Sequence, residues 1–113
     1  MKAAIIGSRS FDNYQLMKDS LSKHNITEII SGGASGADSL SEKYALEKGI
    51  PLTIHLPNWK AFGKTAGMVR NYKIVTDADI IIAFWDGSSK GTKNSIDTAN
   101  QLGKEVIIIS FDK

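Results

Sequence analysis

Apolar runs that alternate with helical patterns are the feature that most restricts the fold of this chain. The runs lie at residues 2–7, 26–31, 51–56, 79–85 and 105–110. The last two are nearly continuous in Ile, Val, Ala, Phe and Trp, with little polar alternation. Strands that are buried on both faces of a parallel sheet have this composition. The chain is therefore expected to build a parallel sheet.

Four segments between the runs have apolar residues at spacings of three and four, which predicts helices with one buried face. Those residues are Tyr14, Met17 and Leu21, then Leu40 and Tyr44, then Met68, Tyr72 and Val75, and finally Ile96, Ala99 and Leu102. Gly49 and Gly103 follow the second and fourth patterns, where helix C-terminal caps are expected. Strands and helices in alternation predict right-handed crossovers. We expect an α/β fold with a single three-layer Rossmann-like domain over residues 1–113 and a five-stranded parallel sheet in the order 3-2-1-4-5.

The composition excludes several classes of protein. Hydrophobic residues make up 42% of the 113 residues, which is enough for a packed core. The chain has no cysteine, and His24 and His55 are far apart in the sequence, so no metal site is predicted. The N-terminus runs directly into a strand-like segment, and no apolar stretch approaches the roughly 18 residues of a membrane span. We therefore expect a cytoplasmic protein without a membrane partner.

Charge gives a weaker indication about nucleic acids. The net charge is +2, and the charged residues are scattered along the chain. A nucleic-acid-binding surface usually has a denser basic patch. The charge therefore argues against a nucleic-acid partner without excluding one.

The segment Ser31-Gly-Gly-Ala-Ser-Gly-Ala-Asp38 lies between the second run and the second helix. A strand, a glycine-rich turn and a helix start are the parts of a phosphate cradle, because glycine lets the backbone approach an anion and the helix offers unpaired N–H groups. The spacing is not that of a dinucleotide fingerprint, and no cofactor is predicted. Asp38 has two interpretations, as the acid of a capping box with Ser35 or as an acceptor for a ribose hydroxyl.

The predicted strand order places a ligand between the first and fourth strands, where the order reverses. Ser8 and Arg9 follow the first strand, and a second glycine- and hydroxyl-rich loop follows the fourth. In that loop, Lys90-Gly91-Thr92 forms either an ordinary helix cap or a second anion cradle with Gly87 and Ser88. Three such loops are expected to converge on one crevice.

The ordered set of motifs resembles the SLOG superfamily, and within it the small YspA-like branch. The motifs are Gly7-Ser8-Arg9, the glycine-rich run that ends at Asp38, Trp59, Gly63-Lys64, Ala66-Gly67, Arg70-Asn71 and the run from Phe84 to Thr92. The resemblance spans nearly the whole chain. It implies a Rossmann-like fold, a nucleotide or nucleotide-derived ligand, and a homodimer. Members of the superfamily include the Lonely Guy phosphoribohydrolases, which split nucleoside monophosphates, and DprA, which handles single-stranded DNA.

One position departs from the Lonely Guy pattern. Those enzymes carry Gly-Gly-x-Gly-Thr-x-x-Glu after the fourth strand, and the glutamate acts in glycosidic cleavage with an arginine of the preceding helix. Gly91 and Thr92 match this motif, and Arg70 is the candidate for the arginine, but Ser95 stands in place of the glutamate. A serine cannot supply the carboxylate that stabilises an oxocarbenium-like centre or activates water. Asp38, Asp86 and Asp97 are the acids considered as substitutes.

Three hypotheses about function follow. The first is a module that binds or senses a nucleotide or nucleotide-derived ligand. The second is a phosphoribohydrolase or other N-glycosidase, and the third is a DprA-like binder of single-stranded DNA, so whether the protein is an enzyme stays open. The candidate catalytic residues are Arg70 and Asp38. The candidate ligand-binding residues are Gly7, Ser8, Arg9, Gly32, Gly33, Ala34, Gly36, Asp38, Arg70, Asn71, Asp86, Gly87, Ser88, Lys90, Gly91 and Thr92.

Overall fold

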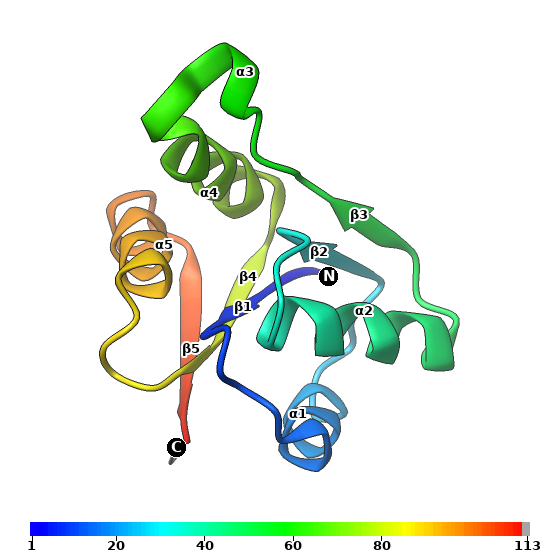
Figure 1. Ribbon diagram of the computed structural model, residues 1–113. Helices are drawn as coiled ribbons and strands as arrows, with labels where there is room; N and C mark the ends of the chain where they lie inside the picture. Colours follow the sequence, from blue (N-terminus) through cyan, green and yellow to red (C-terminus); the bar gives the residue numbers. More distant parts are fainter. Residues whose placement is uncertain (112–113) are drawn as a thin grey trace.

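A computed structural model describes residues 1–111 and contains an all-parallel sheet between two layers of helices (Figure 1). The strands are β1 (Lys2–Gly7), β2 (Glu28–Ser31), β3 (Leu52–Ile54), β4 (Ile80–Trp85) and β5 (Glu105–Ser110). The helices are α1 (Tyr14–Leu21), α2 (Ala37–Lys48), α3 (Trp59–Phe62), the 3-10 helix η1 (Gly63–Thr65), α4 (Ala66–Asp77) and α5 (Lys90–Gln101). The strand order is β3-β2-β1-β4-β5, which confirms the predicted Rossmann-like fold. Within residues 1–111, no helix has the length and apolar character needed to cross a membrane.

The sheet separates two hydrophobic cores because successive side chains of its inner strands point to opposite faces. On one face, Ile5 of β1 lies in a buried cluster with Met17 of α1 and Tyr44 of α2. On the other face, Ile6 of β1 lies in a cluster with Ile74 of α4, to which α5 also contributes. Figure 1 shows α1 and α2 on one side of the sheet and α4 and α5 on the other. Burial on both faces thus explains the apolar run of β4, whereas β5 is an edge strand with Ile108 47% exposed, so the two-faced burial predicted for its run is wrong.

The path of the chain reverses between β1 and β4. From β1 the chain passes through α1, β2 and α2 to the edge strand β3, and it then returns through α4 to β4 on the other side of β1. The loops after β1 and β4 therefore lead to helices on opposite faces of the sheet. This divergence opens a crevice at the carboxyl edge of the strands, as is general for open α/β sheets.

Helix α4 buries only one residue of the apolar stripe that its sequence predicts, Val75, which is 0% exposed. Met68 and Tyr72 are 60% and 53% exposed, whereas Ile74 is buried. The preceding turns α3 and η1, which the apolar pattern did not predict, bring the chain to α4 from the outside of the molecule. Arg70 lies one turn before Ile74 and so shares its inward face. The rotation of α4 thereby directs Arg70 toward the carboxyl edge of the sheet.

Candidate functional site

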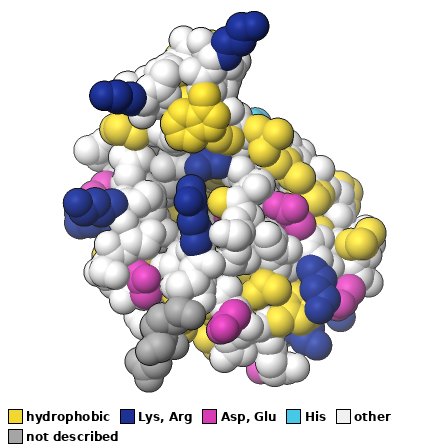
Figure 2. Space-filling model, in the orientation of Figure 1, with side chains coloured by type: hydrophobic (Ala, Val, Ile, Leu, Met, Phe, Trp, Pro, Cys, Tyr) yellow, Lys and Arg dark blue, Asp and Glu magenta, His cyan; other side chains and the backbone are white. Residues whose placement is uncertain are grey.

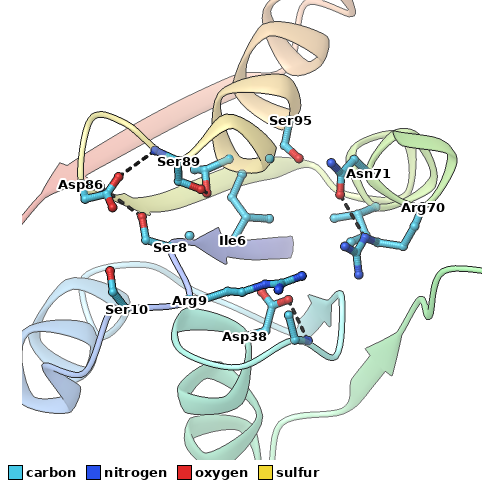
Figure 3. Close-up of a pocket in the computed structure, with 15 residues that line it drawn as sticks. Ile6, Ser8, Arg9, Ser10, Asp38, Arg70, Asn71, Asp86, Ser89 and Ser95 are labelled. Carbon is cyan, nitrogen blue, oxygen red and sulfur yellow. Dashed lines mark hydrogen bonds between the residues drawn. The ribbon is translucent and has the colours of Figure 1, made fainter. Parts of the chain in front are cut away.

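A cavity of about 430 Å³ lies at the carboxyl edge, between the loops that follow β1, β2 and β4 (Figure 3). We call it the inner compartment. One face of α4 and the first turns of α5 complete its wall. Its lining residues are Ile6, Gly7, Ser8, Arg9, Ser10, Ala34, Asp38, Arg70, Asn71, Ile74, Asp86, Ser89, Gly91, Thr92 and Ser95.

A second hollow of about 580 Å³ adjoins the first on the side of β3, α3 and α4. We call it the outer compartment. It shares Arg9, Ala34, Arg70, Asn71 and Gly91 with the inner compartment, and its other lining residues are Gly32, Gly33, Leu56, Pro57, Trp59, Lys64, Gly67, Met68, Lys90 and Asn94. Figure 2 shows Lys and Arg side chains near the middle of this face of the molecule, next to hydrophobic ones. The two hollows form one continuous cleft.

Arg70 closes over the backbone of the loop that follows β2. Its Nη1 donates to the carbonyl oxygen of Gly32 at 2.6 Å, and its Nε donates to Oδ1 of Asn71 at 3.0 Å. The amide of Asn71 donates in turn to Oδ1 of Asn94 on α5, at 3.2 Å. This chain of hydrogen bonds fixes the guanidinium at the junction of the two compartments.

Gly32 leaves room for the side chains that cover the loop. A Cβ at this position would lie 2.7 Å from Nη1 of Arg70 and 3.0 Å from Oδ2 of Asp38. The φ angle of Gly32 is not in the left-handed region, so the backbone conformation does not require a glycine. The close approach of Arg70 and Asp38 is therefore sufficient to explain a glycine at position 32, without a bound anion.

Asp38 binds the glycine-rich loop and faces the inner compartment. Its Oδ2 accepts a hydrogen bond from the N–H of Ala34 at 3.1 Å. The capping box with Ser35 is not formed, because the N-cap of α2 is Gly36, which has no side-chain cap. Burial raises the pKa of the Asp38 carboxyl, and the Ala34 N–H and the charge of Arg70 oppose that rise. The buried carboxyl is therefore held in place while it borders the cavity.

The loop after β1 is locked against the start of α2. The carbonyl oxygen of Ser8 accepts from the N–H of Ala37 at 3.3 Å, and its hydroxyl accepts from the N–H of Asp86 at 3.2 Å. Gly36 has φ +72°, and a Cβ there would lie 2.5 Å from the Ser8 carbonyl oxygen. Ser8 thus joins the loops of three strands at the floor of the inner compartment.

The loop after β4 closes on its own aspartate. Oδ1 of Asp86 accepts from the N–H groups of Ser88 and Ser89, both at 2.9 Å, and these donors lower the pKa of Asp86. The indole Nε1 of Trp85 donates to the carbonyl oxygen of Ser89 at 3.1 Å. Gly87 and Ser88 line neither compartment. The backbone donors that a cradle around them would need are already directed at Asp86.

The other predicted residues are distributed over the two compartments. Gly7, Ser8, Asp86 and Thr92 line the inner one, Gly32, Gly33 and Lys90 line the outer one, and Ala34 and Gly91 line both. Gly36 lines neither and packs against the β1 loop instead. Asp97 pairs with Lys93 at 2.8 Å on the outer surface of α5, so it lies outside the cleft. Ser95, in contrast, is 3% exposed and borders the inner compartment.

Several lining residues were not among the predicted ligand-binding set. Leu56, Trp59 and Met68 form an apolar wall of the outer compartment, with Lys64 beside them. Trp59 and Lys64 belong to the quoted SLOG-like motifs, but their position in space could not be predicted because the turns α3 and η1 were not expected. Within residues 1–111, no group of three or more His, Asp or Glu side chains is arranged as metal ligands.

The parallel sheet with a cleft at its switch point defines the chain as a Rossmann-like α/β protein. The model of the family described as "YspA, cpYpsA-related SLOG family" matches residues 1–62. The Gene 61 protein of Mycobacterium phage D29 is 35% identical over 85 residues, which are 70% of this chain and 68% of the phage protein. The chain belongs to the YspA-related SLOG family, and the resemblance seen in the sequence is confirmed.

A solved structure extends the likeness of fold beyond the matched segment. The X-ray structure of DNA processing protein A (DprA) from Streptococcus pneumoniae superposes with a TM-score of 0.82 at 18% sequence identity. The superposition covers 98% of this chain and 50% of the DprA chain, so this chain spans half of that protein. At such low identity the similarity concerns the fold, which this chain shares from β1 to β5.

Proposed function

We propose that the protein binds a nucleotide or nucleotide-derived small molecule in the cleft. One observation carries the proposal, namely that the glycine-rich loop, Arg70 and the start of α5 all face the same hollow at the β1–β4 switch. The N-terminus of a helix attracts anions through its free N–H groups and its dipole. A Cβ at Gly91, in the first turn of α5, would meet nothing within 4 Å, so the backbone there is open to an approaching group.

Arg70 supports the proposal because its orientation is fixed before any ligand arrives. It uses two N–H groups on Gly32 and Asn71 and has others left to donate. A guanidinium held in this way grips a phosphate with little loss of side-chain entropy. The ordered side chain is therefore suited to phosphate recognition.

The apolar wall of the outer compartment suits the base of a nucleotide. Trp59 and Met68 are 59% and 60% exposed although both line the hollow. An exposed indole offers a flat face on which a planar base can stack. Apolar contact with few polar groups is the usual composition of small-molecule sites.

Isothermal titration calorimetry with the 5′-mono- and diphosphates of adenosine, guanosine, cytidine and uridine tests the proposal. At a ligand concentration of 100 Kd, binding is expected to stabilise the fold by about 2.7 kcal/mol, which a thermal melt detects. Arg70→Gln is expected to weaken binding about tenfold or more, as loss of a charged hydrogen bond implies. The matched control is Lys73→Gln on the same helix, outside both compartments. Absence of binding across the panel, or equal losses in the two variants, contradicts the proposal.

Asp38 favours an N-glycosidase as a second candidate. Burial raises the pKa of this carboxyl, which borders the inner compartment near Arg70. A raised pKa is typical of a carboxyl that delivers a proton to a leaving group. Incubation with nucleoside monophosphates would then release free base, and Asp38→Asn would abolish the release. Recovery of intact nucleotide after binding rules out this candidate.

The outer compartment also has features of a single-strand DNA site, the third candidate. Trp59 lies among Lys64, Lys90 and Arg70, and single strands are bound by cationic grooves with stacking aromatic side chains. Fluorescence anisotropy with labelled oligo-dT would show binding that weakens steeply as salt rises. No binding at low salt removes this candidate.

A further inference from the structure

The two compartments differ in the balance of charged side chains that line them. Arg9, Lys64, Arg70 and Lys90 line the outer one, and no Asp or Glu among the described residues does so. The inner compartment shares the two arginines but adds the carboxylates of Asp38 and Asp86. The cationic excess is therefore confined to the outer half of the cleft.

The inner compartment is better suited to neutral hydroxyl groups than to phosphate. Asp38 and Asp86 both line this space, so a phosphate placed there would lie beside two acidic side chains, of which Asp38 is 8% exposed and Asp86 has its pKa lowered by the N–H groups of its own loop. Thr92 and Ser95 line the same space and are 5% and 3% exposed. Carboxylates and hydroxyls together accept and donate hydrogen bonds as a sugar requires.

Resting on the proposed function, we infer that the cleft takes a ribonucleotide with two or more phosphates, folded so that its ribose hydroxyls lie in the inner compartment while its phosphates lie in the outer one, beside the base on the Trp59 and Met68 wall. Four cations exceed what one phosphate needs, because a phosphate monoester carries about −1.5 to −2 at neutral pH. Arg70 and Gly91 line both compartments and so meet the phosphate next to the sugar. Lys64 and Lys90, which line only the outer hollow, meet the phosphate beyond it.

Calorimetry with adenosine, AMP and ADP, repeated with the guanosine series, tests the placement of the phosphates. Wild-type protein is expected to bind the diphosphate about tenfold more tightly than the monophosphate. The double variant Lys64→Ala/Lys90→Ala is expected to lose this preference for the diphosphate, while its affinity for the monophosphate changes less than about threefold. The control Lys60→Ala/Lys73→Ala removes the same charge from residues outside both compartments and is expected to keep the preference.

The placement of the sugar is tested with ADP and 2′,3′-dideoxy-ADP. Wild-type protein is expected to prefer ADP by about fivefold or more. Asp38→Asn keeps an acceptor for the Ala34 N–H but removes the carboxylate charge, so the preference is expected to fall while affinity for the dideoxy compound holds or rises. Circular dichroism melts of every variant verify folding.

The outcomes separate this inference from the proposed function. Equal affinity for AMP and ADP, equal loss of both in the Lys64/Lys90 variant, or an unchanged sugar preference in Asp38→Asn overturns the inference and leaves nucleotide binding intact. Failure of every nucleotide to bind overturns both.

Discussion

The glycines of the 31–38 segment differ in what they do, although the sequence suggests one shared role. Gly32 makes room for the side chains of Arg70 and Asp38, whereas Gly36 has φ +72° and presses its backbone against the β1 loop. Gly49 has a similar φ of +67° at the end of α2, but open space surrounds it. Substitutions at these three positions separate strain, steric contact and ligand binding.

Gly36→Ala is expected to destabilise the fold far more than Gly49→Ala. Both changes place a Cβ on a left-handed residue, which costs roughly 1–2 kcal/mol. At Gly36 the new Cβ also collides with the carbonyl oxygen of Ser8, and backbone cannot move aside as a flexible side chain can. In urea denaturation, Gly36→Ala is expected to lower the free energy of unfolding by at least about 2 kcal/mol more than Gly49→Ala does. Similar losses in the two variants would show that the loops of β1 and β2 are not locked together.

Gly32→Ala is expected to weaken nucleotide binding more than it weakens the fold. The new Cβ collides with Nη1 at the flexible end of the Arg70 side chain, which shifts and loses its hydrogen bond to the Gly32 carbonyl oxygen. The expected result is about tenfold weaker binding in calorimetry, with a loss in stability under about 1 kcal/mol. Unchanged affinity would mean that the position of Arg70 over the loop does not matter for the ligand.

At the scale of elements, the strands were predictable where the apolar run is continuous. The runs at 2–7 and 105–110 match β1 and β5, and the run at 79–85 exceeds β4 by one residue. The run at 51–56 is longer than β3, because this edge strand pairs with β2 over only three residues. The edge strand β3 thus ends where its pairing with β2 ends, whereas β1 and the other edge strand, β5, extend over the whole of their apolar runs.

The site was predictable only in its location. The strand order placed the three loops at one edge, and that edge carries the cleft. The exposure of Met68 and Tyr72 could not be foreseen, since their spacing with Val75 is that of a buried helix face. The hydrogen bonds from the N–H groups of Ser88 and Ser89 to Asp86 could not be foreseen either, because they depend on the conformation of the local turn. Orientation of helices and turns is a tertiary property, and it decides which side chains reach the cleft.

Asp77 links three elements and is expected to make stability sensitive to acid. It ends α4 and contacts His55 after β3 at 3.2 Å and Lys2 of β1 at 3.4 Å. The hydrogen bond from His55, and then Lys2, lower the pKa of the Asp77 carboxyl below its usual 3.8, against the effect of burial. The carboxyl thus contributes stability above the unfolded pKa and loses it as pH falls through the lower folded pKa.

The comparison of wild-type protein with Asp77→Asn checks this expectation. Melting temperatures measured from pH 6 down to pH 3 are expected to differ most at the upper end and to converge as Asp77 is protonated. Because the side chain is 31% exposed, the difference is expected to be small. A difference in melting temperature that stays constant from pH 6 to pH 3 would show that the ionised form of Asp77 does not stabilise the fold.

At the scale of the whole molecule, apolar side chains on α3 and α4 suggest where a second copy would dock. Phe62 is 42% exposed and Tyr72 is 53% exposed, and neither of them lines the cleft. Soluble monomers seldom expose grouped apolar side chains, and most homo-oligomers are two-fold dimers that use one patch twice. We therefore propose that these helices form the interface of the expected homodimer.

Sedimentation equilibrium tests the homodimer. Wild-type protein is expected to be dimeric at micromolar concentration, and Phe62→Asp/Tyr72→Asp is expected to be monomeric because the paired charges would be buried together. Leu46→Asp is the control, since Leu46 is 84% exposed on α2, on the other side of the sheet. A monomeric wild-type protein, or a dimer that survives the double substitution, contradicts the proposal.

The bond between the Trp85 indole and the Ser89 carbonyl oxygen has a practical consequence. The chain has two tryptophans, and the other, Trp59, stands on the outer wall of the same cleft. Trp85 lines neither compartment but is hydrogen-bonded to Ser89, which lines the inner one, whereas Trp59 is largely open to solvent. With Trp59→Phe and Trp85→Phe, the emission of the remaining indole would report either on the loop after β4 or on the outer wall, so the effect of a ligand on each can be followed without any label.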